Sequence, residues 1–388
     1  MAKSREELLR LLNCPEGLEN LKKLMETEPA PITGRDVNNH IHTTYSFSPY
    51  SPTAAVYFAR AEGLNTCGIM DHDSIAGAEE FRAAGKIAGM GTTCGFEARV
   101  SLRGTPFESL RTNHPDQAGA AYMAFHSVPC ESFDKAQKKL RALAEKRNER
   151  NRKMTRKINE IMNPFGIELD FDRDVLPISN FAVGGSVTER HLLYALSLKI
   201  INKVGKANVL SFLENELGIH PSAKVCAWLS DTESEHFAYD VLGVMKSELN
   251  ARTYIPADEE MMTLDEAVAF ADEIGCTLCY AYLGDIGDSV TGDKKSAKFE
   301  DAYLDELMAF LKERGVKGIT YMPSRNTDQQ MDRLMSLCDQ MGFTQISGED
   351  INSSRQSFIC RELAKPKFRH LVDAAWRLVN QEVREDIK

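Results

Sequence analysis

The chain has 388 residues, of which 43% are hydrophobic, and a formal net charge of −10 at pH 7. This length supports a large core, in one domain with an insertion or in two to three domains. The negative charge disfavours binding of nucleic acid or an anionic membrane by the molecule as a whole, although a local basic region would reverse this. No apolar run approaches the roughly 20 residues that span a bilayer, so no membrane partner is expected.

The first residues, "MAKSREELLRLLNCPEG", lack an apolar signal core and predict a short amphipathic helix. The nine cysteines are scattered and odd in number. In a chain without an export signal this pattern favours reduced thiols. We therefore expect a cytoplasmic protein.

After an N-terminal helical extension over residues 1–33, short predicted strands alternate with predicted helices. Strands are expected at 36–44, 65–72, 92–102 and 120–128, and helices at 51–63 and 74–89. The helix at 51–63 has clear ends, with Ser51 as N-cap, Pro52 in the first turn and Gly63 as the stop. Alternation of this kind predicts an α/β fold with a parallel sheet or barrel.

The alternation stops between residues 131 and 250, where long helical patterns predict an inserted helical subdomain. It resumes after Pro256 with helices at 263–275, 299–315 and 327–342 and strands at 276–284, 318–324 and 343–350. A last amphipathic helix is expected within residues 361–388. The predicted barrel therefore consists of residues 34–130 and 251–360.

Two histidines lie one residue apart in "NNHIHTTYSFSPYSP", at the end of the first predicted strand. Residues i and i+2 of a strand point to the same side, so His40 and His42 would aim at one point, as two ligands of one metal ion do. The alternative is a surface strand that happens to carry two histidines. The motif by itself is too short to decide.

Further imidazoles and carboxylates follow the other predicted strands. In parallel barrels the carboxyl ends of the strands form one face, where sites are built. Imidazole together with carboxylate suits Zn, Mn or Fe. A satisfied core histidine is the alternative for His126 taken alone. The side chains expected at this face are His72, Glu97, His126 and Asp350.

The stretch "HIHTTYSFSPYSP", followed by "GIMDHDSIAGAEEF", resembles the first two motifs of the PHP (polymerase and histidinol phosphatase) family. Members of this family are metal-dependent phosphoesterases on a distorted (β/α)7 TIM-like barrel. The helical insert, with "RNERNRKMTRKINEI" and "GSVTERHLLYAL", resembles that of the TrpH-like branch, whose members hydrolyse nucleotide and RNA-end phosphates. The resemblance covers about residues 34–355.

By position, the resemblance implies one complete metal site made of His40, His42, Glu97 and Asp350. It also implies two ligands of a second site, Glu97 and His126, and one ligand of a third, His72. Three family ligands are replaced, by Phe47, by Tyr282 in "AYLG" and by Asn352 in "GEDINS". We therefore expect one firmly bound divalent ion (Mn, Fe or Zn), a second site with fewer ligands that the Tyr282 phenol would complete, and not three ions.

The expected reaction is metal-assisted hydrolysis of a phosphate ester in a small phosphorylated metabolite, a nucleotide or an RNA end. Expected catalytic groups are His72, Tyr282 and Asp285, although Asp285 also fits an ordinary loop turn. Expected substrate contacts are Arg325, Arg190, His191 and Asn352.

Three features of the sequence also have purely structural explanations. Arg325 also suits a surface ion pair, and His191 also suits helix capping or packing. The basic run at 132–162 would steer anionic substrates, or it forms a solvated helix face. For the whole chain, the alternatives are a non-phosphate metal-dependent hydrolase or isomerase on the same barrel, and a non-catalytic metal-binding relative.

Overall fold

The computed structural model describes residues 3–27, 36–285 and 298–385. The expected boundary between residues 33 and 34 lies outside these ranges. Among the described helices, none combines the length and the apolar character that crossing a bilayer requires.

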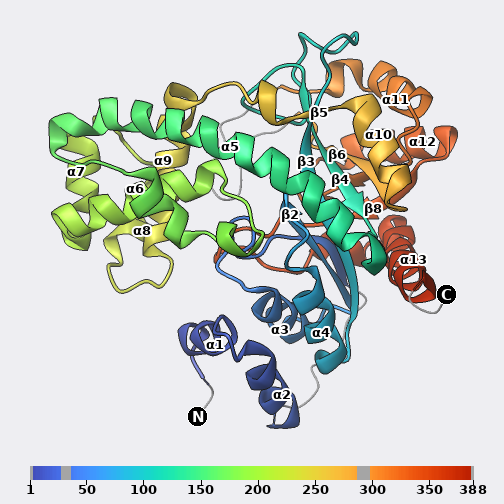
Figure 1. Ribbon diagram of the computed structural model, residues 1–388, viewed down its shortest axis with the longest axis horizontal. Helices are drawn as coiled ribbons and strands as arrows, with labels where there is room; N and C mark the ends of the chain where they lie inside the picture. Colours follow the sequence, from blue (N-terminus) through green and yellow to red (C-terminus); the bar gives the residue numbers. More distant parts are fainter. Residues whose placement is uncertain (1–2, 28–35, 286–297, 386–388) are drawn as a thin grey trace.

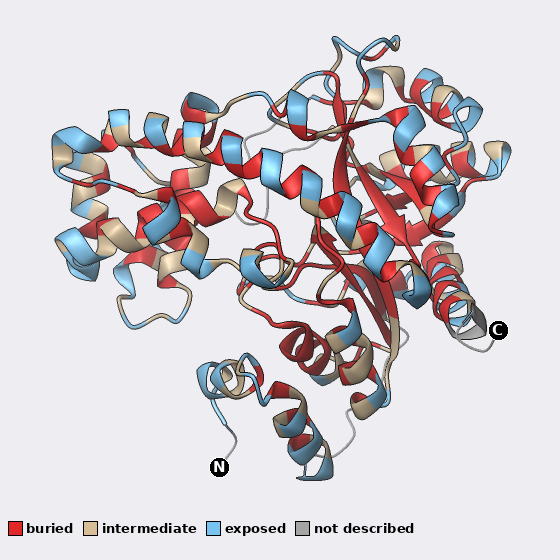
Figure 2. Ribbon diagram, viewed as in Figure 1, coloured by how far each residue is buried: buried red, intermediate tan, exposed pale blue. Residues whose placement is uncertain are grey.

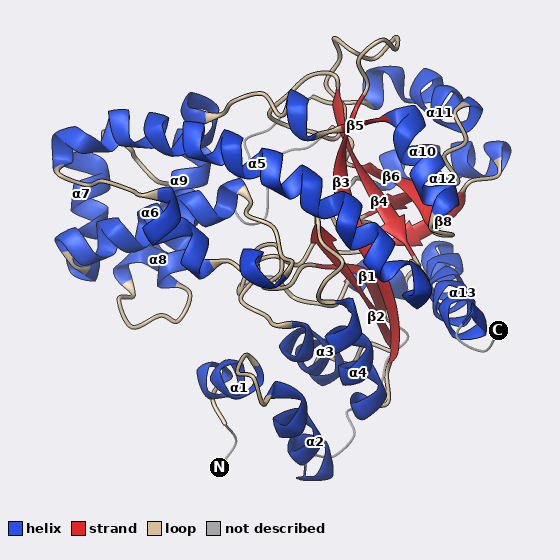
Figure 3. Cartoon of the chain, in the orientation of Figure 1, coloured by secondary structure: helices blue, strands red, loops and turns tan. Residues whose placement is uncertain are grey.

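The centre of the molecule is a mixed sheet that nearly closes into a barrel (Figure 3). Its strands follow the order β1-β2-β3-β4-β6-β7-β8, and the short strand β5 pairs with β3 beside this path. A parallel bridge between Ile41 and Ile351 joins the two ends of the sheet. The strands are β1 (Val37–Ile41), β2 (Thr66–His72), β3 (Gly91–Ser101), β4 (Ala120–His126), β5 (Met262–Thr263), β6 (Thr277–Tyr282), β7 (Gly318–Tyr321) and β8 (Thr344–Ser347).

Helices cover the outside of this sheet (Figure 1). Three of them begin with a capping box, in which Ser4, Thr263 or Thr327 exchanges hydrogen bonds with the residue three positions later. The surrounding helices are α1 (Arg5–Leu12), α2 (Gly17–Thr27), α3 (Pro52–Ala61), α4 (Ala78–Ala88), α10 (Leu264–Glu273), α11 (Leu304–Glu313), α12 (Asp328–Met341) and α13 (Arg369–Glu385). The expected α/β fold, a distorted TIM-like barrel with an inserted helical part, is confirmed.

One strand departs from the expected parallel arrangement. No helix separates β3 from β4, and β4 runs antiparallel to both β3 and β6. The carboxyl end of β4 therefore lies beside the amino end of β6, where His126 pairs with Thr277. This reversal decides which residues of β4 lie at the level of the site.

The interior of the barrel is closed on the side opposite the site. Met70, Ala124, Cys279 and Ile346 come from β2, β4, β6 and β8 and pack together with Leu378 of α13. Glu382 of α13 also accepts a hydrogen bond of 2.7 Å from the backbone N–H of Cys94, near the start of β3. Helix α13 therefore seals the end of the barrel where β3 begins.

The inserted helices form a second hydrophobic core of their own. Figure 2 shows that the sheet is buried almost throughout, whereas the outer sides of the helices are exposed. The insert consists of α5 (Phe133–Met162), α6 (Glu189–Val204), α7 (Val209–Asn215), α8 (Ala223–Ser230) and α9 (Phe237–Thr253).

A buried cluster of charges joins the insert to the barrel. The carboxylate of Glu260 contacts the guanidinium groups of Arg99 on β3 (2.5 Å) and of Arg147 (3.1 Å) and Arg150 (2.8 Å) on α5. Glu189 at the start of α6 pairs with Arg99 at 2.6 Å and also with Arg150. Because nearly every member is buried, each charge depends on its partners to offset the cost of leaving water.

Replacing Glu260 by Gln should lower the free energy of unfolding by about 3–5 kcal/mol, because three buried guanidinium groups lose a shared counter-ion. Denaturant unfolding measures this. The matched control is Asp265→Asn, because Asp265 pairs with Arg314 at the surface and should cost less than about 1 kcal/mol. Equal losses in the two variants would contradict the prediction.

The pH dependence supplies a second readout of the same variant. Burial alone would raise the pKa of Glu260, but Arg147, Arg99 and Arg150 outweigh it and lower the pKa below the usual 4.5. A carboxyl group with a depressed folded-state pKa stabilises the protein above about pH 4.5 and loses this effect as the pH falls. Glu260→Gln should therefore be less stable than the wild type at neutral pH. Its free energy of unfolding should also fall less than that of the wild type when the pH is lowered.

Candidate metal centre

The turn after β1 fixes the orientation of the first two histidines. Buried Asp71 accepts hydrogen bonds from Thr43 N (2.6 Å), Thr43 Oγ1 (2.5 Å) and Ser46 Oγ (2.6 Å). Since Ser46 gives its hydrogen to Asp71, its oxygen is available as an acceptor for Nδ1–H of His42, which lies 3.3 Å away. In neutral His42 this leaves the Nε2 lone pair directed away from the turn, as in a metal ligand.

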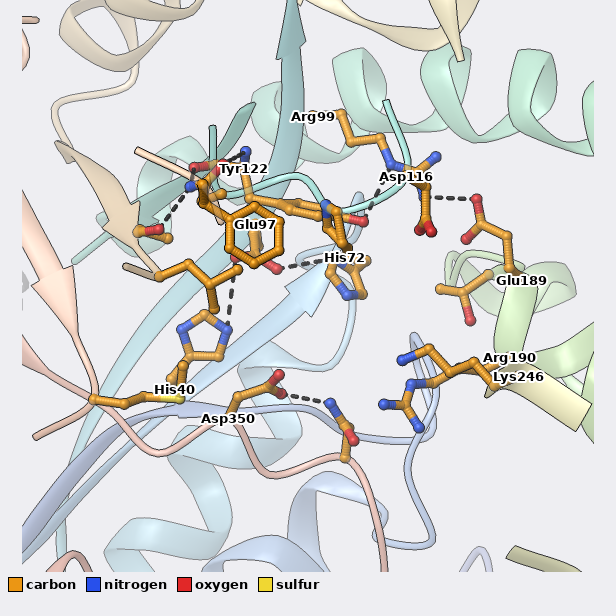
Figure 4. A pocket seen from close by; sticks show the side chains of 18 of the residues that line it. His40, His72, Glu97, Arg99, Asp116, Tyr122, Glu189, Arg190, Lys246 and Asp350 are labelled. Carbon is orange, nitrogen blue, oxygen red and sulfur yellow. Dashed lines mark hydrogen bonds and ion pairs between the residues drawn. The ribbon is translucent and has the colours of Figure 1, made fainter. Parts of the chain in front are cut away.

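Imidazoles and carboxylates from four parts of the chain converge at one end of the barrel (Figure 4). His42 Nε2 lies 3.2 Å from Asp350 Oδ1, His72 Nδ1 lies 3.1 Å from Glu97 Oε2, and His40 Nε2 lies 3.8 Å from Glu97 Oε1. Two sets of three donors each have their ligand atoms within 4.8 Å of one another. These sets are His40, His42 and Asp350, and His42, His72 and Glu97.

The donor set fits a divalent metal ion. Nε2 of His42 is buried and makes no hydrogen bond within the described part of the chain, even though a carboxylate oxygen is 3.2 Å away. A buried imidazole nitrogen that lacks a hydrogen-bond partner and lies beside a carboxylate is suited to bind a metal ion. Mixed nitrogen and oxygen donors suit Mn, Fe and Zn.

The charges of these groups are strongly coupled. Burial lowers the pKa of His42, but the carboxylate of Asp350 outweighs it and the pKa is raised overall. Burial would raise the pKa of Asp350, but His42 and His40 hold it well below its usual value. Burial and the charge of His42 lower the pKa of His40 to about 4 and that of His72 well below its usual value. His40 and His72 are therefore neutral at pH 7 and able to offer a lone pair.

A cavity of about 340 Å³ opens beside these donors. His40, His72, Glu97 and Asp350 line one side (Figure 4). Arg190 and Lys246 reach the cavity from helices α6 and α9 of the insert, and Arg111 and Arg325 from barrel loops. Nε of Arg325 is buried without a hydrogen-bond partner among the described residues. The cavity thus combines clustered metal-type donors with cationic side chains, an arrangement suited to an anionic ligand.

Asn352 also belongs to this cavity. Its Nδ2–H donates a 2.6 Å hydrogen bond to Oδ1 of Asp350. The side chain expected as a substrate contact therefore also holds the carboxylate of Asp350 in place.

Among the described residues, four expected site residues do not line the cavity: His42, His126, Asp285 and His191. His42 nevertheless belongs to both donor sets. His126 lies deeper in the barrel because β4 is antiparallel, so that Ala124 is the residue opposite Glu97. The carboxylate of Asp285 accepts a 2.7 Å hydrogen bond from the backbone N–H of Phe299, a residue distant in the chain. Nδ1 of His191 accepts a 3.0 Å hydrogen bond from Thr188 N–H and caps α6.

Tyr282 and Phe47 lie at positions where the resemblance to the PHP family implies metal ligands, and both contact other side chains. Tyr282 lines the cavity, but its hydroxyl donates a 2.5 Å hydrogen bond to Asp301. Phe47 is buried in the core of the insert, with its ring 5.0 Å from that of His191 and 5.6 Å from that of Tyr194. Phe47 thus attaches the insert to the loop that follows His42.

Several residues that line the cavity were not predicted from the sequence, above all Tyr122 and Arg99. The Tyr122 ring lies 5.5 Å from that of His72, and its hydroxyl accepts a 3.3 Å hydrogen bond from Arg99 Nε. Tyr122 lies two residues from Ala124 and therefore faces the same side of β4. An antiparallel assignment of β4 would have directed attention to Tyr122 rather than to His126.

Comparison with known proteins gives partial matches. No family model matches the chain. A stretch of 165 residues, 42% of this chain, is 28% identical to a 5′-3′ exoribonuclease of Haemophilus influenzae and covers 51% of that protein. The chain therefore matches about half the length of this relative.

Two solved structures share the fold over most of the chain. One is a protein of Bifidobacterium adolescentis, provisionally named a metal-dependent phosphoesterase, with a TM-score of 0.54, 16% identity and coverage of 91% of this chain and 98% of that one. The other is an amidohydrolase of Chromobacterium violaceum with bound sulfate and no metal, with a TM-score of 0.56, 17% identity and coverage of 87% and 96%. At this level of identity the likeness shows the fold alone.

The converging donors predict that the protein binds Mn²⁺ or Zn²⁺ at one to two ions per chain and not three. Asp350→Asn should weaken binding at least about 100-fold, because it removes a ligand charge. His126→Gln should retain wild-type affinity, since His126 lies outside both donor sets. Titration calorimetry and elemental analysis measure these values, and circular dichroism checks the fold. Loss of binding in His126→Gln with Asp350→Asn unaffected would contradict the assignment.

Metal binding should also release a proton from His42. The pKa of His42 is raised by Asp350, and Nε2 must be deprotonated before it binds an ion. Affinity should therefore fall about tenfold for each pH unit below that pKa. Calorimetry at acidic pH in buffers of different ionisation enthalpy reports the released proton. A pH-independent affinity between about pH 5.5 and 7.5 would be inconsistent with this coupling.

Proposed function

We propose that this protein is a metal-dependent hydrolase that cleaves a phosphate ester. The observation that carries the proposal is the donor set of His40, His42 and Asp350, with Glu97 3.8 Å from His40, beside a cavity with cationic walls. A phosphate ester suits this site because its negatively charged oxygens would contact both the metal ion held by these ligands and the arginine side chains.

The names of similar proteins support the same reaction class. One neighbour in fold is provisionally named a metal-dependent phosphoesterase, and the other holds a sulfate, which has the shape and charge of a phosphoryl group. The relative that matches part of the chain is an exoribonuclease. We propose a small phosphorylated metabolite, a nucleotide or an RNA end as the substrate, and the PHP family, in its TrpH-like branch, as the affiliation.

The proposed ligands of one Mn, Fe or Zn ion are His40, His42, Glu97 and Asp350. Such an ion supplies a Lewis acid that withdraws electron density from a phosphoryl oxygen and makes water more acidic. Hydrolysis joins a water oxygen to phosphorus, breaks the bond from phosphorus to the ester oxygen and leaves a proton on the released alcohol.

His72 is the proposed proton acceptor. Its Nδ1 faces Glu97 Oε2 at 3.1 Å, so a proton held there leaves Nε2 with a free lone pair. The ring lines the cavity and is neutral at pH 7, because burial and the charges of His42 and Arg147 lower its pKa. A neutral imidazole in this place takes a proton from the attacking water.

Arg190 and Arg325 are proposed to bind the phosphoryl group. Both line the cavity, and Arg190 lies close enough to Asp350 to help lower the pKa of that carboxyl group. Positive charge there would neutralise the non-bridging oxygens and orient the ester toward the metal ligands. Tyr282, Asp285 and His191 take no direct part in this proposal, because their polar atoms have structural partners.

A second candidate is hydrolysis of an amide or related C–N bond. It is favoured by the amidohydrolase name of the neighbour in fold, and the same ligands would serve it. A screen of phosphomonoesters, nucleotides and N-acyl amino acids with added Mn²⁺ separates the two reactions.

A cytoplasmic location is part of the proposal. All nine cysteines have free thiols, and structural disulfides are the usual mark of an oxidising compartment.

With Mn²⁺ present, we expect phosphatase or nucleotidase turnover in this screen. His72→Asn should lower kcat by about 100- to 10 000-fold, because a proton acceptor is lost, and should retain the Mn²⁺ ion bound by His40, His42 and Asp350. Arg190→Ala should raise KM by about 10- to 100-fold, the worth of a charge-assisted hydrogen bond.

The matched control is Arg173→Ala, since Arg173 is an exposed arginine of the insert outside the cavity. It should behave as the wild type. Turnover of the amides alone would reject the phosphate ester, and Mn²⁺ binding without any turnover would favour a non-catalytic metal-binding protein.

A further inference from the structure

One proposed ligand is held differently from the others. His40 and Glu97 lie within strands, and His42 follows β1 directly, whereas Asp350 lies three residues beyond the end of β8. The backbone that carries Asp350 belongs to a loop, residues 350–356, which we call the Asp350 loop. The position of its carboxylate therefore depends on what holds this loop.

Gln356 closes the Asp350 loop from within. Its Nε2–H donates a 2.6 Å hydrogen bond to the backbone oxygen of Asp350, and its Oε1 accepts one of 2.8 Å from Asn352 N–H. Asn352 in turn donates from Nδ2 to the carboxylate of Asp350. The amide of Gln356 thus fixes both the backbone of the ligand and the residue that orients its carboxylate.

Arg355 ties the same loop to the insert. Its Nε and Nη2 donate to the two carboxylate oxygens of Asp240 at 2.7 and 2.8 Å, a two-pronged contact. Asp240 is buried on α9, and the guanidinium group also lies 4.4 Å from the ring centre of Trp228 on α8. A planar guanidinium satisfies both contacts at once, which a lysine ammonium cannot do.

The neighbouring Ser354 adds contacts to two further elements. Its hydroxyl lies 2.7 Å from Nδ1 of His236, which precedes α9, and its backbone oxygen accepts a 3.1 Å hydrogen bond from Arg5 of α1. Three consecutive residues of the Asp350 loop are therefore held by the insert, by the N-terminal helix and by the loop itself.

We infer that Arg355 and Gln356 are positioning residues for metal binding, which act through Asp350 and connect the insert to the metal centre. The inference rests on the proposed metal-dependent function. Groups that orient a ligand commonly change metal affinity by about 10- to 100-fold when they are removed. The insert then has two roles, because it supplies Arg190 to the cavity and also sets the geometry of a ligand on the barrel.

Mn²⁺ titration calorimetry on the full chain tests this inference. Arg355→Lys keeps the charge and removes the two-pronged contact, and Gln356→Met keeps the length and removes both hydrogen bonds. Each should weaken Mn²⁺ binding about 10-fold or more. The matched control is Arg314→Lys, whose arginine contacts both oxygens of Asp265 between outer helices and does not line the cavity.

A combination with Asp350→Asn separates positioning from a general loss of stability. If Arg355 and Gln356 act through Asp350, their substitution should not weaken Mn²⁺ binding further in the Asp350→Asn background. Thermal unfolding without metal should show that each variant is still folded at the temperature of the titration. An affinity equal to that of the control, or an equal loss with and without Asp350, would overturn the inference. Failure of the wild type to bind Mn²⁺ would instead overturn the proposed function on which it rests.

Discussion

The closure of the sheet between residues 40–42 and Ile351 is the constraint on which the candidate centre depends. Ile351 N–H donates to the backbone oxygen of His40, and His42 N–H donates to the backbone oxygen of Ile351. These two hydrogen bonds are 3.1 and 3.0 Å long. They hold the backbone of Ile351 against residues 40–42 and thereby place the neighbouring Asp350 beside the two histidines. Residues more than 300 positions apart thereby share one site, and Glu97 and His72 join it through the pairing of β2 with β3.

The insert is connected to this site by several kinds of contact. Buried ion pairs join α6 directly to β3 and join α5 to β3 through Glu260. The ring of Phe47 enters the core of the insert, and Arg355 reaches α9. Buried charges tolerate little displacement, because each loses its partner when the two parts separate. The insert and the barrel are therefore expected to hold one fixed arrangement around the cavity, with cationic side chains of α6 and α9 opposite the metal donors.

Three positions at which the resemblance to the PHP family implies metal ligands carry other residues. At position 47 a hydrophobic ring now serves the packing of the insert, and at position 282 a phenol bonds to Asp301. Position 352 keeps a polar side chain, which supports Asp350 through a hydrogen bond. None of these three side chains belongs to the donor sets of the described residues, which consist of His40, His42, His72, Glu97 and Asp350.

The sequence by itself determined the fold class, the helical insert and the residues most directly tied to strand ends. His40 and His42 could be predicted because the period of a strand places i and i+2 on one side, and His72 because parallel strands end at one face. Glu97 lies inside β3 rather than at its end, and it reaches the site through its pairing with His72. Only the tertiary structure decided the rest, since it depends on contacts between distant segments. The reversed direction of β4 moves His126 below the donors and brings Tyr122 to the cavity, and no local pattern encodes strand direction. In the same way, His191 caps a helix whereas its neighbour Arg190 lines the cavity, because the docking of α6 against the barrel decides which side of its first turn faces the site.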